Sequence, residues 1–163
     1  MLSTGIDIVE VRRIDRHVQR FGASFLKHVY SSAEISRYST DTGQLAGAFA
    51  AKEAVAKALG VGFAYLAGFG VLPVDIEIAL SESLIVGTCQ VALHGTARQR
   101  AIDLHLAQWA LSVIRLDGYA IALVTATSAD VPPQSTIAAT ISAGRSISRR
   151  HLSGKFYARS KHS

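Results

Sequence analysis

The stretch GAFAAKEAVAKALGVG, residues 47–62, contains the strongest single signal for the fold. Its run of alanines and other apolar residues predicts a helix over about residues 44–59, which ends at the Gly-Val-Gly step. Glu53 and Lys57 are four positions apart, so their side chains share one face of that helix. Taken alone, this spacing is typical of an ordinary surface ion pair. The surrounding apolar residues, however, place both charges beside the expected core.

The spacing of apolar residues along the sequence predicts the other helices and strands. A helix that starts at about Glu10 is expected to end near Gly22, and Ser31 or Ser32 is expected to cap the next helix. The last two strands are expected to form a hairpin around the sequence RLDG. Helices mixed with locally paired strands favour an α+β fold. In chain order, we expect a strand over 2–9, helices over 10–22 and 31–39, strands over 74–80 and 89–94, a helix over 95–108, and strands over 109–114 and 119–126.

Length and composition favour one compact domain. The chain has 163 residues, of which 49% are hydrophobic. Its apolar stretches, such as residues 119–126, are too short to span a bilayer, so no membrane association is expected. The first residues lack a basic flank followed by an apolar run, so no secretory signal is expected. Cys89 is the single cysteine, which excludes an intramolecular disulfide and favours a cytoplasmic location.

The net charge of +5 belongs to the end of the sequence. Residues 128–163 contain six basic residues and one acidic residue, so residues 1–127 are neutral overall. We expect residues 1–127 to form the folded domain and residues 128–163 to form a basic extension rich in Ser, Thr and Ala. One hypothesis is that this extension binds RNA or a membrane surface. Its only aromatic residues are Phe156 and Tyr157, so nucleic-acid binding is not favoured.

Asp7 is the second residue that indicates chemistry. A carboxylate inside an apolar strand needs a partner or a cation, although a buried, hydrogen-bonded structural role is the alternative. Two carboxylates, a lysine and a glycine step are the components of a site for Mg²⁺ and a polyphosphate. Asp7, Glu53, Lys57 and the step formed by Gly60 and Gly62 are therefore the candidate site.

Two longer motifs resemble the holo-acyl-carrier-protein synthase family of 4′-phosphopantetheinyl transferases. They are GIDIVEVRRI, residues 5–14, and LAGAFAAKEAVAKALGVG, residues 45–62. VDIEI and SVIRLDGYAIALV match that family more weakly, and the resemblance covers about residues 2–126. It implies a single domain of the phosphopantetheinyl transferase type, with an antiparallel sheet and a long central helix.

The resemblance also implies the reaction, which is transfer of 4′-phosphopantetheine from coenzyme A to a serine of an apo acyl or peptidyl carrier protein. Asp7 and Glu53 would bind Mg²⁺, and Glu53 or a water held by Asp7 would help to remove the serine proton. Lys57 would contact the diphosphate and stabilise or protonate the leaving oxygen of 3′,5′-ADP. Residues implied in coenzyme binding are Phe49, Lys57, Gly60, Gly62 and Arg115.

The partners implied by the resemblance are an acidic carrier protein and further copies of the chain. Arg13 and Arg20 would meet the carrier protein, although an arginine-bearing helix face is also typical of simple solvation. A homotrimer with active sites between subunits is implied, in which a neighbour supplies the Arg115 hairpin. The carrier protein would serve fatty acid biosynthesis or a dedicated polyketide or peptide pathway.

Three positions depart from the family pattern. Ala48 replaces an arginine, Val61 replaces the threonine of a Gly-Thr-Gly step, and Arg115 replaces a histidine. Arginine can hold a phosphate but cannot act as a base near neutral pH. Ala48 and Val61 favour an alternative hypothesis, a catalytically weakened paralogue that binds coenzyme A or a carrier protein without efficient turnover.

Overall fold

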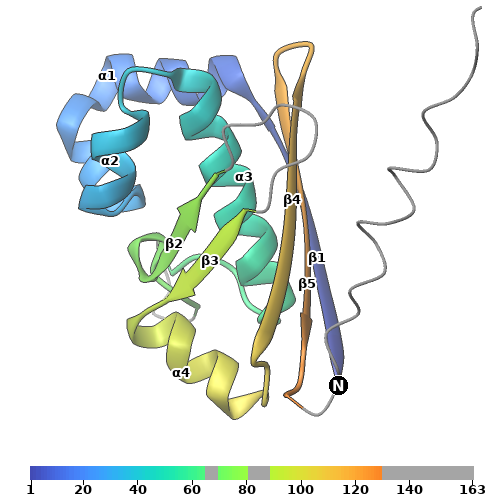
Figure 1. Ribbon diagram of the computed structural model, residues 1–163. Coiled ribbons are helices and arrows are strands. Elements are labelled where there is room, and N and C mark those ends of the chain that lie inside the picture. The colour runs from blue at the N-terminus through green and yellow to red at the C-terminus, as the bar shows by residue number, and fades with distance from the viewer. Residues whose placement is uncertain (65–69, 81–88, 130–163) are drawn as a thin grey trace, which may run out of the picture. The chain divides into compact units, whose positions relative to one another are not determined.

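The computed structural model describes residues 1–64, 70–80 and 89–129, which belong to one compact unit (Figure 1). The elements in chain order are β1 (Leu2–Glu10), α1 (Val11–Val29), α2 (Ser32–Tyr38), α3 (Thr42–Ala58), the short 3₁₀ helix η1 (Pro73–Asp75), β2 (Ile76–Ala79), β3 (Gln90–Leu93), α4 (Gly95–Asp103), β4 (Gln108–Leu116) and β5 (Tyr119–Thr127).

The described strands form two antiparallel sheets on either side of α3. One sheet has the order β1-β5-β4, and β2 pairs with β3 in the other. Figure 1 shows α3 between the long sheet and the β2-β3 pair, with α1 and α2 beside its first turns. The prediction of an α+β fold with an antiparallel sheet and a long central helix is confirmed.

The central helix α3 is buried on nearly every side. Twelve of its 17 residues are buried, which explains why its sequence is apolar all round rather than on one stripe. The sheet meets α3 through small and branched side chains, and this allows a close approach. The buried side chains on that inner face include Val9, Ala120, Ala122, Val124 and Ala126.

Strand β1 shows why the alternation of its residues matters. Gly5 and Val9 are buried and Asp7 is partly buried, whereas Thr4, Ile6 and Ile8 are exposed on the other face. Because successive side chains of a strand point to opposite faces, Asp7 points to the same side as the residues that pack on α3. The fold therefore directs this carboxylate toward the central helix.

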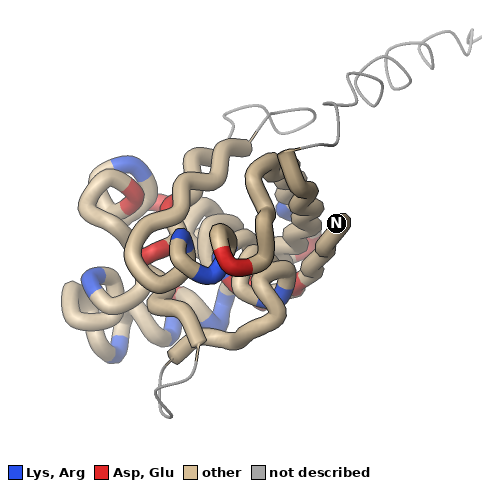
Figure 2. Tube along the Cα trace, turned by 90° about the horizontal axis from the view of Figure 1, so that it is seen from below, with Lys and Arg blue, Asp and Glu red and all other residues tan. Residues whose placement is uncertain are grey.

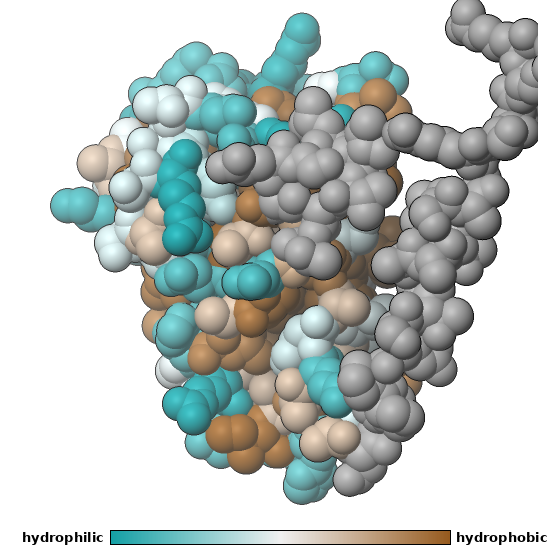
Figure 3. All heavy atoms as spheres, viewed as in Figure 1, coloured by the Kyte–Doolittle hydropathy of each residue, from teal (hydrophilic) through white to brown (hydrophobic). Residues whose placement is uncertain are grey.

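The outer face of the three-stranded sheet is apolar and exposed in the single chain. The register places Ile8 opposite Ile121, which in turn lies opposite Ile114. The exposed large side chains on this face are Leu2, Ile6, Ile8, Ile114, Leu116, Tyr119 and Leu123. This outer face is turned away in Figure 3, whose brown apolar patches lie among teal polar residues on another side of the molecule. The outer face itself is defined by the exposed residues just listed. An apolar surface of this extent is typical of an interface.

Several boundaries differ from the sequence predictions. The helix predicted to end near Gly22 bends there, since Gly22 has φ 52° and ψ −132°, and helical structure resumes as far as Val29. Helix α3 begins earlier than predicted because Asp41 caps it by accepting a hydrogen bond from the Gln44 amide. Helix α4 ends at Asp103, five residues before the predicted end, and the predicted strand over 74–80 begins with η1.

Some predictions fall on residues outside the described ranges. The basic extension predicted over residues 128–163 lies outside them from residue 130 onward. In the described ranges, no helix combines the length and the hydropathy that crossing a membrane requires. Figure 2 shows Lys and Arg in blue and Asp and Glu in red along the described chain.

Candidate active site

Asp7 of β1 and Lys57 of α3 form the centre of the candidate site. The Lys57 Nζ lies 2.7 Å from Oδ1 of Asp7 and donates a further hydrogen bond of 3.0 Å to the backbone oxygen of Ile6. The Asp7 side chain is 15% exposed, whereas that of Lys57 is 49% exposed. The carboxylate is therefore fixed and mostly enclosed, and the ammonium group remains accessible to a ligand.

Glu53 lies one helical turn before Lys57 in α3, and the charges of Asp7, Lys57 and Arg13 all act on it. Burial and the neighbouring carboxylate of Asp7 raise the pKa of Glu53, while Lys57 and Arg13 oppose that rise. In the described part of the chain, the structure records no hydrogen bond to the Glu53 carboxylate. Side chains from β1, α1 and α3 thus interact at one place, and two of them are acids.

This donor set fits a hard divalent cation. In proteins, Mg²⁺ is held by one or two carboxylates together with water and substrate phosphates, rather than by a cage of protein ligands. Over residues 1–64, 70–80 and 89–129, no cluster of three or more His, Cys, Asp or Glu side chains could hold a metal. Asp7 and Glu53 are two carboxylates that could bind such an ion together with ligands from water and a substrate.

The glycine step after α3 differs from its sequence interpretation. The amide of Gly60 donates to the Lys57 oxygen at 2.9 Å, and that of Val61 donates to the Ala56 oxygen at 3.0 Å. This pair of bonds is a Schellman cap, in which Gly60 takes the left-handed conformation with φ 71°. These two amides are therefore used to end the helix and do not point toward an anion. Gly62 has open space where a side chain would be.

Arg100 of α4 lies beside this step, and the sequence interpretation missed it. Its Nε donates to the Leu59 oxygen at 3.2 Å, and its guanidinium lies next to Gly60. The sequence placed Arg100 in a helix but offered no signal that this helix packs against the end of α3. The contact joins residues 41 positions apart, which no local pattern reports.

Phe49 and Arg115 lie apart from the acidic pair. Phe49 is 6% exposed and packs edge-on against Phe63. Its ring is therefore part of the hydrophobic core. Arg115 of β4 has its Nη1 3.9 Å from Oδ2 of Asp41, the residue that caps the first turn of α3. Lys57 is in the last turn of the same helix. A single chain therefore does not bring Arg115 to Asp7, Glu53 and Lys57.

The arginines of α1 form a basic surface that begins at the candidate site. Arg13 is exposed and close enough to Glu53 to lower its pKa. Farther along α1, the Arg20 guanidinium lies 5.1 Å from the centre of the Phe21 ring. A surface hollow of about 470 Å³ is lined by Arg16, His17, Gln19, Arg20 and Phe21. Arg13 and Arg20 thus lie on one basic, partly aromatic face.

The comparisons with known proteins agree with these features. The sequence pattern of the 4′-phosphopantetheinyl transferase superfamily matches residues 3–124. A holo-[acyl-carrier-protein] synthase of Herpetosiphon aurantiacus is 40% identical over 129 residues, which cover 76% of this chain and 97% of that protein. One from Roseiflexus castenholzii is 46% identical over 105 residues, which cover 64% of this chain and 75% of that protein.

Solved structures show the same relationship. The holo-[acyl-carrier-protein] synthase of Helicobacter pylori in complex with coenzyme A has 31% sequence identity and a TM-score of 0.63, and the match covers 76% of this chain and 99% of that one. The predicted family and the predicted enzyme class are confirmed. The chain belongs to the 4′-phosphopantetheinyl transferase superfamily.

Proposed function

We propose that this chain transfers 4′-phosphopantetheine from coenzyme A to a serine of an apo acyl carrier protein, depends on Mg²⁺ and releases 3′,5′-ADP. The observation that carries the proposal is the cluster of Asp7, Glu53 and Lys57, which joins the first strand to the central helix. The names of the matched relatives support the carrier-protein substrate, and the Helicobacter pylori complex supports coenzyme A.

The reaction needs a base, a group that binds the diphosphate and a stabilised leaving group. The serine oxygen forms a bond to the phosphorus next to pantetheine, the bond from that phosphorus to the ADP oxygen breaks, and the serine proton passes to a base. Glu53, or a water held by Asp7, accepts that proton, and the raised pKa makes Glu53 a better base. Half-exposed Lys57 binds the diphosphate and stabilises or protonates the departing oxygen.

Asp7 and Glu53 would hold the Mg²⁺ ion. When bound, such an ion neutralises negative charge on the diphosphate. Gly62 supports the coenzyme site through the open space beside its backbone, whereas Gly60 shapes the helix end that carries Lys57. Phe49 supports the coenzyme site indirectly, because its buried ring packs edge-on against Phe63.

The proposed partner is an acidic carrier protein that docks on the basic face of α1. The charge of Arg13 opposes the rise in the pKa of Glu53, so a carrier protein bound at Arg13 would present its serine on the side of the proposed base. Arg20 lies beside the hollow farther along the helix. Exposed charge pairs of this kind guide association and fix orientation more than they add affinity.

We also propose that the chain works as a homotrimer in the cytoplasm. The apolar outer face of the β1-β5-β4 sheet is the surface that further copies would cover. Arg115 lies far along α3 from Lys57 in its own chain, so its proposed contact with coenzyme A requires a neighbouring subunit. The single cysteine, Cys89, fits a reducing compartment.

The test is a transfer assay with coenzyme A, Mg²⁺ and a panel of apo carrier proteins, read by mass spectrometry. We expect a mass gain of one phosphopantetheine group, abolished by Glu53→Ala. Lys57→Met should lower the rate on the order of 10²-fold or more, because it removes a preorganised positive charge. Arg37→Met, a change of an exposed cation on α2, is the matched control and should leave the rate unchanged. Coenzyme binding without mass gain on any carrier would support the inactive-paralogue alternative instead.

A further inference from the structure

Lys52 and Glu34 are two buried charges that the proposed reaction does not use. Both side chains are 0% exposed, and the Lys52 Nζ lies 2.7 Å from Oε2 of Glu34. Lys52 immediately precedes Glu53 in α3 but points into the protein, toward α2 and η1. Removing two charges from water is costly unless the geometry satisfies both groups, so an ion pair placed here needs a physical reason.

All three donors of the Lys52 ammonium group have acceptors. Besides Glu34, it donates to the backbone oxygen of Pro73 at 2.9 Å and makes a short hydrogen bond to the backbone oxygen of Ile76. Burial lowers the pKa of Lys52, and the Glu34 carboxylate opposes that effect. An ammonium has three N–H groups, so this one is saturated. An apolar side chain at position 52 would leave the two backbone carbonyls without these donors.

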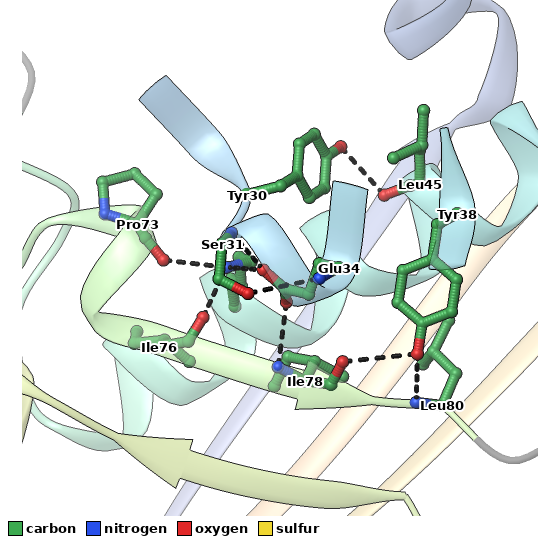
Figure 4. Close-up of polar contacts among 10 residues, drawn as sticks. Tyr30, Ser31, Glu34, Tyr38, Leu45, Pro73, Ile76, Ile78 and Leu80 are labelled. Atoms are coloured by element: carbon green, nitrogen blue, oxygen red, sulfur yellow. Dashed lines mark hydrogen bonds and ion pairs between the residues drawn. The ribbon is translucent and has the colours of Figure 1, made fainter. Parts of the chain in front are cut away.

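Glu34 completes the same network from α2. Its Oε2 accepts from the Ser31 amide at 2.7 Å, and its Oε1 accepts from the Ile78 amide at 2.8 Å. The Ser31 hydroxyl in turn accepts from the Glu34 amide, which makes a complete capping box. Figure 4 shows Glu34 between Ser31 and Ile78. The backbone oxygens of Pro73 and Ile76 accept from the same Lys52 ammonium group that pairs with Glu34. The pair thus joins α2 and α3 to the chain from Pro73 to Ile78.

The chain just before Pro73 contacts the glycine step. The Val71 amide donates to the Gly62 oxygen at 3.1 Å, and the Ala64 amide donates to the Val71 oxygen at 3.0 Å. We refer to residues 71–76 as the return arm. Gly62 is therefore fixed from two sides: the Schellman cap at Gly60 holds it to the end of α3, and the return arm holds it to Lys52.

We propose that Lys52 is a positioning residue. Its ammonium group anchors the return arm to α3 and so holds Gly62 and Phe63 at the place from which they meet coenzyme A. This inference rests on the proposed function for the identity of the ligand. The anchoring itself rests on the contacts of Lys52, Pro73, Ile76 and Val71 alone.

The test uses Lys52→Met, which keeps the length of the side chain and removes its donors. Because this change leaves the Glu34 charge buried and unpaired, the double variant Lys52→Met with Glu34→Gln is made in parallel. The control is Leu106→Ala, which opens a cavity at a buried position between α4 and β4 and so destabilises the fold at a site outside the return arm. Amide hydrogen exchange and steady-state kinetics are measured on all four proteins.

We expect exchange at the Ala64 and Val71 amides to accelerate about tenfold or more in a folded Lys52 variant, relative to the amides of the β1-β5-β4 sheet. We also expect the KM for coenzyme A to rise roughly tenfold with kcat within about twofold, since the ligand site shifts while the acidic pair stays in place. The Leu106→Ala control should show neither change.

Normal exchange at Ala64 and Val71 in the folded variants, or an equal rise in KM in the Leu106→Ala control, would overturn the inference. A folded Lys52 variant whose KM for coenzyme A equals that of an active wild type would also overturn it. A wild type that transfers no phosphopantetheine would instead overturn the proposed function, and the exchange measurement would then decide the anchoring role by itself.

Discussion

The α-carbon of Gly5 lies so close to the carbonyl oxygen of Ala54 that a methyl group on Gly5 would overlap it. This contact presses β1 against α3 two residues before Asp7 and one residue after Glu53 along their elements. We expect Gly5→Ala to lower the free energy of unfolding by about 3 kcal/mol, because backbone rather than a flexible side chain would have to move. Denaturant titration followed by circular dichroism measures the change.

Gly47→Ala is the matched control for that substitution. Gly47 lies in the same helix, but a Cβ there would make ordinary contacts of 3.4 Å with the side chains of Leu80 and Val113. Alanine is favoured over glycine in a helix, so we expect stability to stay equal or rise by up to about 1 kcal/mol. Equal losses for the two variants would contradict the specific contact between β1 and α3.

The two glycines of the step after α3 are expected to respond differently. Gly60 has φ 71°, so Gly60→Ala should cost about 1 kcal/mol of stability through left-handed strain at the helix cap. Gly62 does not lie in that region and has open space around it, so Gly62→Ala should leave the unfolding curve unchanged. If Gly62 serves coenzyme approach, its variant should raise the KM for coenzyme A. Thermal unfolding and kinetics on the same samples separate the two roles.

Much of this fold could be predicted because its signals are local. β-branched and apolar residues predicted β1, the RLDG turn predicted the β4-β5 hairpin, and the alanine-rich run predicted α3. Asp7 and Glu53 were first grouped because two carboxylates, a lysine and a glycine step suit a metal and a polyphosphate, and the family resemblance then supported this grouping. No local pattern reports a contact between residues this far apart. Gly22 was interpreted as the end of a helix because glycine is a usual terminator, but a kink uses the same left-handed freedom.

The features that the sequence interpretation missed are long-range and polar. Lys52 looked like one more charge in KEAVAK, yet it is the residue of that segment that points inward to Glu34. Arg100 reaches the end of α3 only because α4 packs there. Pairing of this kind depends on tertiary packing that the helical period of either partner does not contain.

Glu53 is expected to reduce the stability of the metal-free protein at neutral pH. Burial and Asp7 raise its pKa above the unfolded value of 4.5, so between those two pKa values the native state binds more protons than the unfolded state. Stability associated with this group is therefore complete below pH 4.5 and is lost as pH rises through the folded pKa. In chelator, Glu53→Gln should raise Tm at pH 7.5 by a few degrees, with the gain vanishing toward pH 4.

Melting curves across that pH range, with Glu10→Gln as control, measure the effect. Glu10 is an exposed side chain that pairs with Arg16 across 3.6 Å, so its variant should change Tm little at any pH. A Tm difference for Glu53→Gln that stays constant with pH would contradict the electrostatic origin. The same substitution should abolish transfer, so Glu53 would be a residue that lowers stability but is required for activity.

The outer face of the β1-β5-β4 sheet provides the test of assembly. Ile114 of the edge strand β4 lies on this face opposite Ile121 of the central strand and is 57% exposed in the single chain. Ile102 on α4 is 55% exposed and lies outside this face. If further copies cover the sheet, Ile114→Asp buries a charge in an apolar interface and should shift the mass in solution from trimer to monomer. Ile102→Asp, equal in exposure and chemistry, should remain a trimer. Sedimentation velocity gives both masses, and an unchanged trimer for Ile114→Asp, or a monomeric wild type, would exclude this face as the assembly surface.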